Sequence, residues 1–364
     1  MKLDQLKGVF DRPGPYVTVH LDLGRASADA VQQRQARWTT VRHRLQELGV
    51  ADDVVEDIGE RIAENTHVHG EVRRTVVAAR DGIVLDDVQA GHTHWPEVVD
   101  VGELPDLAGW LAVADRSLPF ILVTADREGA DIELHEAISS PSVESTSVEG
   151  ETLDIRKLPV GGWAQKQFQQ TAENNWEENA ELVADEVRRL AREHATAATL
   201  VAGEVRARAE VVKALEKAEP QLTSPVIQIE AGGRAPGASD EALWNEIREV
   251  VTTLEREADV AVTEKLDEAR TKGEGAATGL DEVVEGLREA RVDRLVLDLA
   301  ALHEKTIKPS SWDGLPLPDS AKDAQELPAD RVLVAAGALT GAELTVLPAE
   351  MSHGGGAAAL LRWA

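Results

Sequence analysis

Hydrophobic and polar residues alternate at the start of the chain in the pattern of a strand. Apolar side chains take every second position of Tyr16–Leu23, with Thr18 and His20 among the polar residues between them. This spacing predicts a half-buried strand with its polar residues facing solvent. Two amphipathic helices are expected next, the first with its apolar face from Val31 to Leu48 and the second over residues 54–63. An Asp-Gly pair at residues 81–82 then predicts a hairpin between two apolar runs.

A second group of elements begins near residue 118. Phe120–Ala125 predicts an apolar strand, and a turn leads into a further strand over residues 130–135. The Ser- and Glu-rich stretch over residues 139–151 is typical of an exposed loop or a weak strand pair. Apolar residues spaced by three and four from Trp176 to His194 predict an amphipathic helix. Two short buried strands over residues 199–202 and 226–229, with a helix between them, favour a mostly parallel sheet covered by helices.

The rest of the chain predicts a long helix and a third domain. The helix follows Ser239 and runs to about Lys272, a length of roughly 45–50 Å. Beyond it we expect a helix, a strand over Val292–Leu297 and a proline-rich loop. Two strands over Val332–Ala336 and Leu344–Leu347 follow, and a short helix over Gly356–Trp363 ends the chain. The predicted fold class is α/β, with mixed sheets covered by helices in three domains, residues 1–116, 117–272 and 273–364.

Composition narrows the classes of protein that fit. The 364 residues are 43% hydrophobic and include no cysteine, no membrane-length apolar run and no secretory signal at the start, which predicts a cytoplasmic protein. The net charge of −28 opposes nonspecific binding to nucleic acid, because such binding depends on Lys and Arg that displace phosphate counterions. We therefore expect no DNA partner, and either a local RNA contact or a protein partner.

The segment over residues 158–170 contains the most informative chemistry. Two glycines, Gly161 and Gly162, let the backbone approach another surface closely. The aromatic and charged residues that follow could stack on bases and contact phosphate, and the glutamines offer uncharged donors and acceptors; they are Trp163, Gln165, Lys166, Gln167 and Phe168. The alternative is a loop that caps the following helix, with its tryptophan in a core.

These residues resemble a known family. Gly161–Phe168 is similar to the Gly-Gly-Gln loop of archaeal and eukaryotic class-1 release factors, and it follows a strand-turn-strand like the one in their middle domain. The third domain resembles their C-terminal domain, which is akin to kink-turn-binding ribosomal proteins. The ending from Gly354 to Trp363 looks like the family's final Gly-Ile-Ala-Ala-Ile-Leu-Arg-Tyr. The resemblance implies the archaeo-eukaryotic release factor/Pelota superfamily and its three-domain architecture.

Three further stretches resemble an actinobacterial branch of bacterial release-factor-like proteins, which includes mycobacterial relatives of the hibernation factor Balon. They are Tyr16–Asp22, Trp38–Arg42 and Ala202–Arg208. The resemblance implies a partner in the ribosome, at the RNA of its A site, and the elongation factor EF-Tu as a second partner. It also places Arg206 and Arg208 in a local basic patch, whereas their spacing alone favours solvated arginines on the first turn of a helix.

One departure from the family bears on activity. Release factors use the glutamine after the two glycines to position water, and Trp163 takes that place here. An indole has one N–H donor and no acceptor, so it cannot orient water as a carboxamide does. Gln165, two residues further on, is the candidate catalytic residue if the protein hydrolyses peptidyl-tRNA.

We expect no metal or nucleotide at the two remaining motifs. Two His-x-His pairs, at residues 67–69 and 92–94, lack accompanying cysteine or carboxylate at metal spacing, so we expect exposed or core histidines and no metal. The glycines of residues 273–279 lack the lysine and preceding strand of a phosphate loop and indicate a linker. No cofactor is expected.

Three functions remain open on the sequence. The leading hypothesis is a hibernation or stress factor that occupies the ribosomal A site without peptide release. The second is a peptidyl-tRNA hydrolase for ribosome rescue, and the third is a protein-interaction module that does not bind ribosomes.

Overall fold

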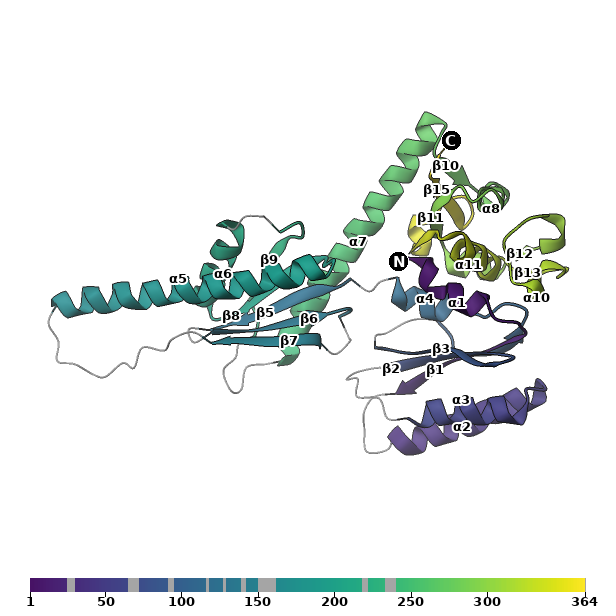
Figure 1. Ribbon diagram of the computed structural model, residues 1–364, viewed down its shortest axis with the longest axis horizontal. Coiled ribbons are helices and arrows are strands. Elements are labelled where there is room, and N and C mark those ends of the chain that lie inside the picture. Colours follow the sequence, from purple (N-terminus) through teal and green to yellow (C-terminus); the bar gives the residue numbers. More distant parts are fainter. Residues whose placement is uncertain are drawn as a thin grey trace. The chain divides into compact units, whose positions relative to one another are not determined.

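The computed structural model shows mixed α/β architecture in two compact units (Figure 1). It describes residues 1–24, 30–64, 72–90, 95–115, 118–126, 129–138, 142–149, 162–217, 222–232 and 240–363, with only the backbone at 30–33, 90, 162–176, 178 and 240. Unit 1 comprises residues 1–116 and 257–364, and unit 2 comprises residues 117–256. Within the described ranges, no helix combines the length and apolar composition needed to cross a membrane.

The N-terminal part of unit 1 is a four-stranded antiparallel sheet in the order β3-β2-β1-β4. Two helices cover one face of the sheet through an apolar layer that includes Leu45 and Ile58 (Figure 1). The predicted hairpin is confirmed, because β2 and β3 are joined at Asp81–Gly82. The elements are β1 (Tyr16–Gly24), β2 (Val72–Ala79), β3 (Gly82–Ala90), β4 (Val98–Gly102), α2 (Ala30–Glu47) and α3 (Asp52–Ala63).

The opposite face of this sheet is also covered, which corrects the prediction of a half-buried β1. Thr18 and His20 are each only 1% exposed. Helix α4 (Ala108–Ala114) lies directly over them, since a Cβ on Gly109 would stand 2.9 Å from His20 Nε2. The polar residues of β1 therefore point into a second layer, which includes η1 (Leu3–Leu6) and α1 (Lys7–Phe10).

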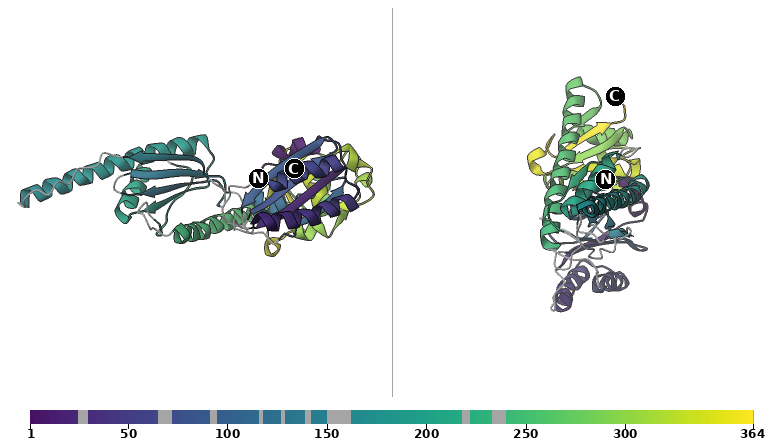
Figure 2. Two further views of the ribbon diagram at one scale, coloured as in Figure 1. Left: turned by 90° about the horizontal axis from the view of Figure 1, so that it is seen from below. Right: turned by 90° about the vertical axis from the view of Figure 1, so that its left-hand side faces the viewer.

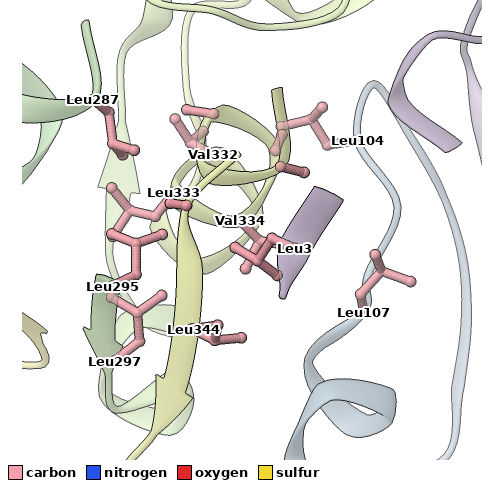
Figure 3. Close-up of a cluster of buried hydrophobic side chains, with 14 of the residues drawn as sticks. Leu3, Leu104, Leu107, Leu287, Leu295, Leu297, Val332, Leu333, Val334 and Leu344 are labelled. Carbon is pink, nitrogen blue, oxygen red and sulfur yellow. The ribbon is translucent and has the colours of Figure 1, made fainter. Parts of the chain in front are cut away.

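The C-terminal part of unit 1 has a sheet in the order β10-β15-β11-β14, and its core is continuous with the layer below α4. Figure 3 shows Leu3 next to Val334 of the C-terminal part, and Leu107 belongs to the same cluster of buried residues. The strands are β10 (Ala276–Thr278), β11 (Val292–Leu297), β12 (Thr306–Ile307), β13 (Leu327–Pro328), β14 (Glu343–Val346) and β15 (Ala357–Leu361). The helices are α8 (Leu280–Arg288), α9 (Leu299–His303), η2 (Pro309–Ser311), α10 (Asp319–Lys322), α11 (Ala329–Thr340) and η3 (Ala349–Met351).

Two predictions in this part are wrong. Val332–Ala336 belongs to helix α11, which starts after Pro328 and ends at Gly341 in the left-handed conformation. An unbroken apolar run carries no period that separates a buried helix from a buried strand. Gly356–Trp363 was expected to be helical, yet Ala357–Leu361 forms β15 between β10 and β11, where backbone pairing on both sides outweighs the helix propensity of alanine.

Unit 2 is a five-stranded sheet in the order β7-β6-β5-β8-β9, in which β5, β8 and β9 are parallel. Helices α5 and α6 cover one face and α7 the other (Figures 1 and 2). The stretch expected as a loop or weak strand contains β7, an edge strand paired with β6. The elements are β5 (Phe120–Ala125), β6 (Gly129–His135), β7 (Ser142–Glu149), α5 (Gly162–Glu193), β8 (Ala198–Gly203), α6 (Val205–Lys217), β9 (Val226–Gln228) and α7 (Asp240–Lys272).

The long helix α7 contributes to the core of each unit. Leu243, Ile247 and Val251 pack on the sheet of unit 2. Further along, Leu266 packs with Val296 and other residues of the C-terminal sheet. The helix predicted from Ser239 to about Lys272 is thus confirmed, while the three domain boundaries stay a prediction.

Candidate functional site

The carboxyl ends of β5 and β8 meet at one edge of the sheet in unit 2. Ala125 and Gly203 are paired at this edge, and Gly203 has a φ of +114°. A Cβ on Gly203 would lie 1.9 Å from the carbonyl oxygen of Ala125, and the next backbone N–H, of Glu204, donates to that oxygen at 2.9 Å. Only glycine fits this close approach. It starts helix α6 at the edge where open α/β sheets commonly bind ligands.

Helix α5 extends beyond the same edge. It runs antiparallel to β8, and Ala180 is the first of its described side chains that lies in the core of unit 2. The helix starts at Gly162, so about 18 residues, or roughly 27 Å at 1.5 Å per residue, precede Ala180. Figure 1 shows this end of α5 projecting past the strands of unit 2. The helix therefore carries Gly162 and the residues that follow it away from the strands of its own unit.

The predicted loop differs from the observed backbone. Gly161 lies outside the described residues, and from Gly162 the backbone is helical through Phe168. Glutamine, lysine and alanine favour helix, and no glycine or proline follows Gly162 in α5 to interrupt it. The side chains of Trp163, Gln165, Lys166, Gln167 and Phe168 lie outside the described part of the structure, so their predicted roles stay predictions.

The two arginines predicted in a basic patch lie on the first turn of α6 in different surroundings. Arg206 is exposed at the sheet edge. Arg208 is 8% exposed, and its Nη1 donates to the carbonyl oxygen of Ile229 at 2.5 Å, which holds the chain after β9 against α6. Of the two, Arg206 has the side chain that a partner can reach.

A groove between α5 and α6 has no excess of positive charge. It encloses about 230 Å³ and is lined by alanines and by charged residues of both signs. Lys213 Nζ donates to Glu210 and to Glu177, each at 3.0 Å, and these bonds raise the pKa of the lysine. Because Lys213 is already paired with two carboxylates, this groove does not supply the cationic surface that RNA binding needs.

Unit 1 contains a polar cluster that sequence reasoning missed. Arg331 donates to Asp100 Oδ2 at 2.6 Å and to Asp106 Oδ2 at 3.0 Å. Asp330 is 2% exposed, and its Oδ2 lies 3.2 Å from His303 Nδ1. Burial raises the pKa of the Asp330 carboxyl, against the opposing effect of His303. No spacing signal could reveal these residues, because they are brought together from three distant parts of the chain.

His20 lies nearby on β1 and is held neutral. Its Nδ1 is 2.7 Å from Thr75 Oγ1, and Arg73 Nη1 is 3.4 Å from its Nε2. Burial, reinforced by the charge of Arg73 and opposed by that of Asp106, lowers the pKa of His20 to about 4. The ring therefore acts as a hydrogen-bonding group within the packed layer. The predicted His-x-His pairs at residues 67–69 and 92–94 lie outside the described residues.

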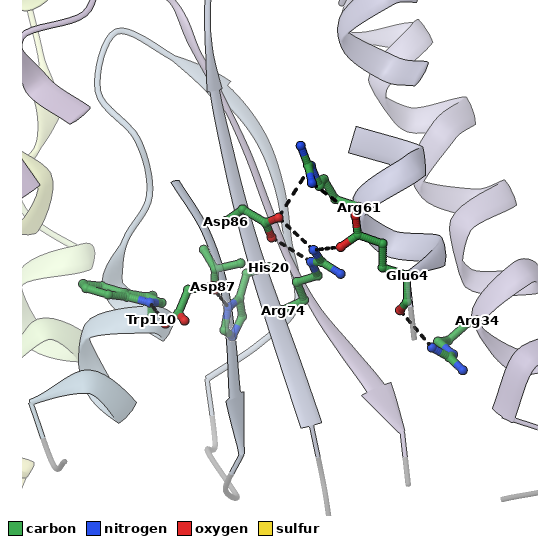
Figure 4. A network of polar contacts seen from close by, with 9 residues as sticks. His20, Arg34, Arg61, Glu64, Arg74, Asp86, Asp87 and Trp110 are labelled. Atoms are coloured by element: carbon green, nitrogen blue, oxygen red, sulfur yellow. Dashed lines mark hydrogen bonds and ion pairs between the residues drawn. The ribbon is translucent and has the colours of Figure 1, made fainter. Parts of the chain in front are cut away.

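A separate network joins strands β2 and β3 to the end of α3 (Figure 4). Arg74 donates through Nε and Nη2 to the two carboxylate oxygens of Asp86, and through Nη2 to Glu64, all at 2.7 Å. Nearby, Trp110 Nε1 donates to Asp87 Oδ2 at 2.7 Å. Because every carboxylate in this network accepts a hydrogen bond from a protein donor, the network stabilises the fold and leaves no carboxylate for a ligand.

Comparisons with known proteins agree with the sequence resemblance. Residues 119–272 match the family described as bacterial archaeo-eukaryotic release factor family 2. Over 354 residues the chain is 26% identical to an uncharacterized protein of two Mycobacterium tuberculosis strains, covering 95% of this chain and 91% of that protein.

Solved structures give likenesses with low identity. Pelota of Archaeoglobus fulgidus is 16% identical, with 100% of this chain and 92% of Pelota covered and a TM-score of 0.37. An archaeal Pelota in a model of ribosome-bound Pelota and ABCE1 is 15% identical, covering 99% and 94%, with a TM-score of 0.42. Dom34 of S. cerevisiae is 11% identical, covering 80% and 79%, with a TM-score of 0.38. The middle part of this chain, residues 119–272, is thus similar to the bacterial archaeo-eukaryotic release factor family 2.

Proposed function

We propose that this protein is a cytoplasmic ribosome-associated factor that occupies the ribosomal A site as a hibernation or stress factor. The observation that carries the proposal is helix α5, whose first residue, Gly162, lies roughly 27 Å along the helix from Ala180 in the core of unit 2. The first residues of the helix lie in the segment Gly161–Phe168, whose sequence resembles the Gly-Gly-Gln loop of release factors. A long helix with such a segment at its tip suits insertion into a narrow RNA-walled space.

The charge of the chain shapes the expected contact. A body with a net charge of −28 is repelled by RNA phosphates over most of its surface. Contact is therefore confined to the tip of α5, with Lys166, and to Arg206 at the edge of the sheet. A protein partner such as EF-Tu supplies a route to the ribosome that does not depend on a basic surface.

Peptide release is not part of this proposal. In the family, the residue after the two glycines positions water, and here that residue is Trp163, whose indole N–H can only donate. Gln165 is the residue that would act if the chain were a hydrolase.

The test is co-sedimentation of the full chain with ribosomes from growing and from starved cells, with and without EF-Tu. The variant is Gly161→Asp/Gly162→Asp, which adds two negative charges at the segment. The matched control is Gln5→Asp/Gly8→Asp, which adds the same charge at exposed positions; a Cβ on Gly8 meets nothing within 4 Å.

We expect the wild type and the control to migrate with ribosomes and the segment variant to remain at the top of the gradient. Equal migration of both variants would exclude the Gly-Gly segment from the contact. No migration of the wild type under any condition would favour a protein-interaction module. Cleavage of peptidyl-tRNA ester by the wild type and its loss in Gln165→Ala would show a hydrolase instead.

A further inference from the structure

Asp106, His303 and Asp330 bring three potential metal ligands together in unit 1. One ligand atom from each lies within 4.8 Å of the other two. Asp106 precedes α4, His303 is the last residue of α9, and Asp330 is in the first turn of α11. Asp106 and Asp330 are 4% and 2% exposed, whereas the His303 side chain is 39% exposed. Two donors are thus fixed in the interior, and the third leaves a path to solvent.

An unsatisfied oxygen points to a missing ligand. Within the described structure, Oδ1 of Asp330 is buried and has no hydrogen-bond partner. A buried carboxylate oxygen without a partner is costly, and such groups in native proteins usually mark a water, an ion or a functional role. Of the three residues, Asp330 alone lines a nearby hollow of about 10 Å³, together with Arg331 and apolar residues of α4, α9 and α11; this is about the room that one water needs.

The charges around the cluster favour a divalent cation. Asp100, Asp106 and Asp330 contribute three carboxylates, and Arg331, bonded to the first two, contributes one guanidinium. The carboxylates thus outnumber the guanidinium in this group. Buried charges are stable only when they are paired, so a cation with two positive charges suits this arrangement better than the empty site.

We propose that Asp106, His303 and Asp330 bind a divalent transition-metal ion of the Zn²⁺ class. One imidazole nitrogen and two carboxylate oxygens suit Zn²⁺ and its neighbours in the first transition row, whereas Mg²⁺ and Ca²⁺ prefer oxygen ligands alone. The solvent-facing side of His303 leaves room for water as a further ligand. Because the ligands come from residues 1–116 and from residues 257–364, the ion fastens the two stretches of unit 1 to each other.

A second group in the chain provides the matched control. Glu144, Glu193 and His194 also bring three ligand atoms within 4.8 Å, but all three side chains are partly or largely exposed. Arg189 already donates to both carboxylates. Both carboxylates of this group are thus paired with a cation, whereas in the proposed site Asp330 has a buried oxygen without a partner, so we expect no metal at the second group.

The experiment is titration calorimetry of Zn²⁺ into the full chain after dialysis against a chelator. We expect one equivalent of tight binding in the wild type and in His194→Gln. His303→Gln and Asp330→Asn should each bind more than about tenfold more weakly, since losing even an outer partner of a metal ligand weakens binding by about that factor. Circular dichroism checks that each variant is folded, and the partly exposed His303 is the position least prone to disturb the core.

A second readout is the visible absorption of Co²⁺ added in place of Zn²⁺. Ligand-field bands that appear in the wild type and His194→Gln but not in His303→Gln would support the site. Wild-type protein that binds no Zn²⁺ overturns the proposal. So does a folded His303→Gln that binds as tightly as the wild type, because the ion would then be held by other residues, including the His-x-His pairs. The outcome is independent of ribosome binding.

Discussion

Replacing Gly203 with alanine tests the close approach of β8 to β5. The new Cβ would lie 1.9 Å from the carbonyl oxygen of Ala125, and the φ of +114° is one that alanine rarely adopts. Backbone strain of this kind costs about 1–3 kcal/mol. Separating the strands to relieve the overlap also weakens the bond from Glu204 N to Ala125, at about 1 kcal/mol. We expect unit 2 to lose about 3 kcal/mol.

Gly232→Ala is the matched control in the same unit. It has a φ of +91°, but the atom that its Cβ would approach, at 2.9 Å, is a flexible terminal carbon of Leu243. The control therefore has the backbone strain without a fixed backbone obstacle, and we expect it to cost about 1–2 kcal/mol.

Hydrogen exchange followed by mass spectrometry reports on unit 2 separately from unit 1. In peptides that cover β8 and α6, Gly203→Ala should exchange about 100-fold faster than the wild type, since each 1.4 kcal/mol is a factor of about ten. The control should exchange more slowly than Gly203→Ala by about tenfold. Equal exchange in the two variants would refute the argument that a backbone atom blocks a side chain at residue 203.

Two further predictions concern unit 1. Tyr16, the single tyrosine of the chain, donates its hydroxyl to Arg12 O at 2.7 Å, and burial is the main cause that raises its pKa to about 12. The tyrosinate absorbance of the folded protein should therefore rise near pH 12. The free energy of unfolding should fall from about pH 10 upward, because the tyrosine of the unfolded chain loses its proton at the lower pH. Tyrosinate absorbance that rises near pH 10 in the folded protein would contradict the burial of Tyr16. Arg74→Met should destabilise unit 1 by about 3 kcal/mol in urea unfolding, because it leaves Asp86 and Glu64 without their shared cation. The control Arg12→Met removes an exposed ion pair and should lower the free energy of unfolding by less than about 1 kcal/mol. An equal decrease in both variants would show that burial of Arg74 does not strengthen its ion pairs.

Local patterns in the sequence predicted much of the fold. Strands such as Val292–Leu297 and the hairpin at Asp81–Gly82 were correct, because alternation and turn chemistry act within a few residues. The errors occur where contacts with residues far away in the sequence determine the secondary structure or the burial of a residue. Ala357–Leu361 is a strand because β10 and β11 flank it, and His20 is buried because α4 covers it.

The candidate sites divide in the same way. The Gly161–Phe168 segment could be found from sequence because its residues are adjacent and resemble a family motif. The cluster of Asp106, His303 and Asp330 could not, because the long segments that separate its members have no common spacing. Arg208 is a third case. Its place at the start of a predicted helix suggested an exposed cation, but the side chain is buried against Ile229, the residue after β9.

The division of the chain into units has a consequence for its synthesis. Unit 2 is one continuous stretch, whereas unit 1 needs residues 257–364 to complete the core that begins at Leu3. Domains fold in the order in which they leave the ribosome. The inserted unit can therefore be finished while the first 116 residues still await their C-terminal partners. A nascent chain interrupted before residue 257 would expose the apolar underside of η1, α1 and α4, a surface that chaperones recognise and that promotes aggregation.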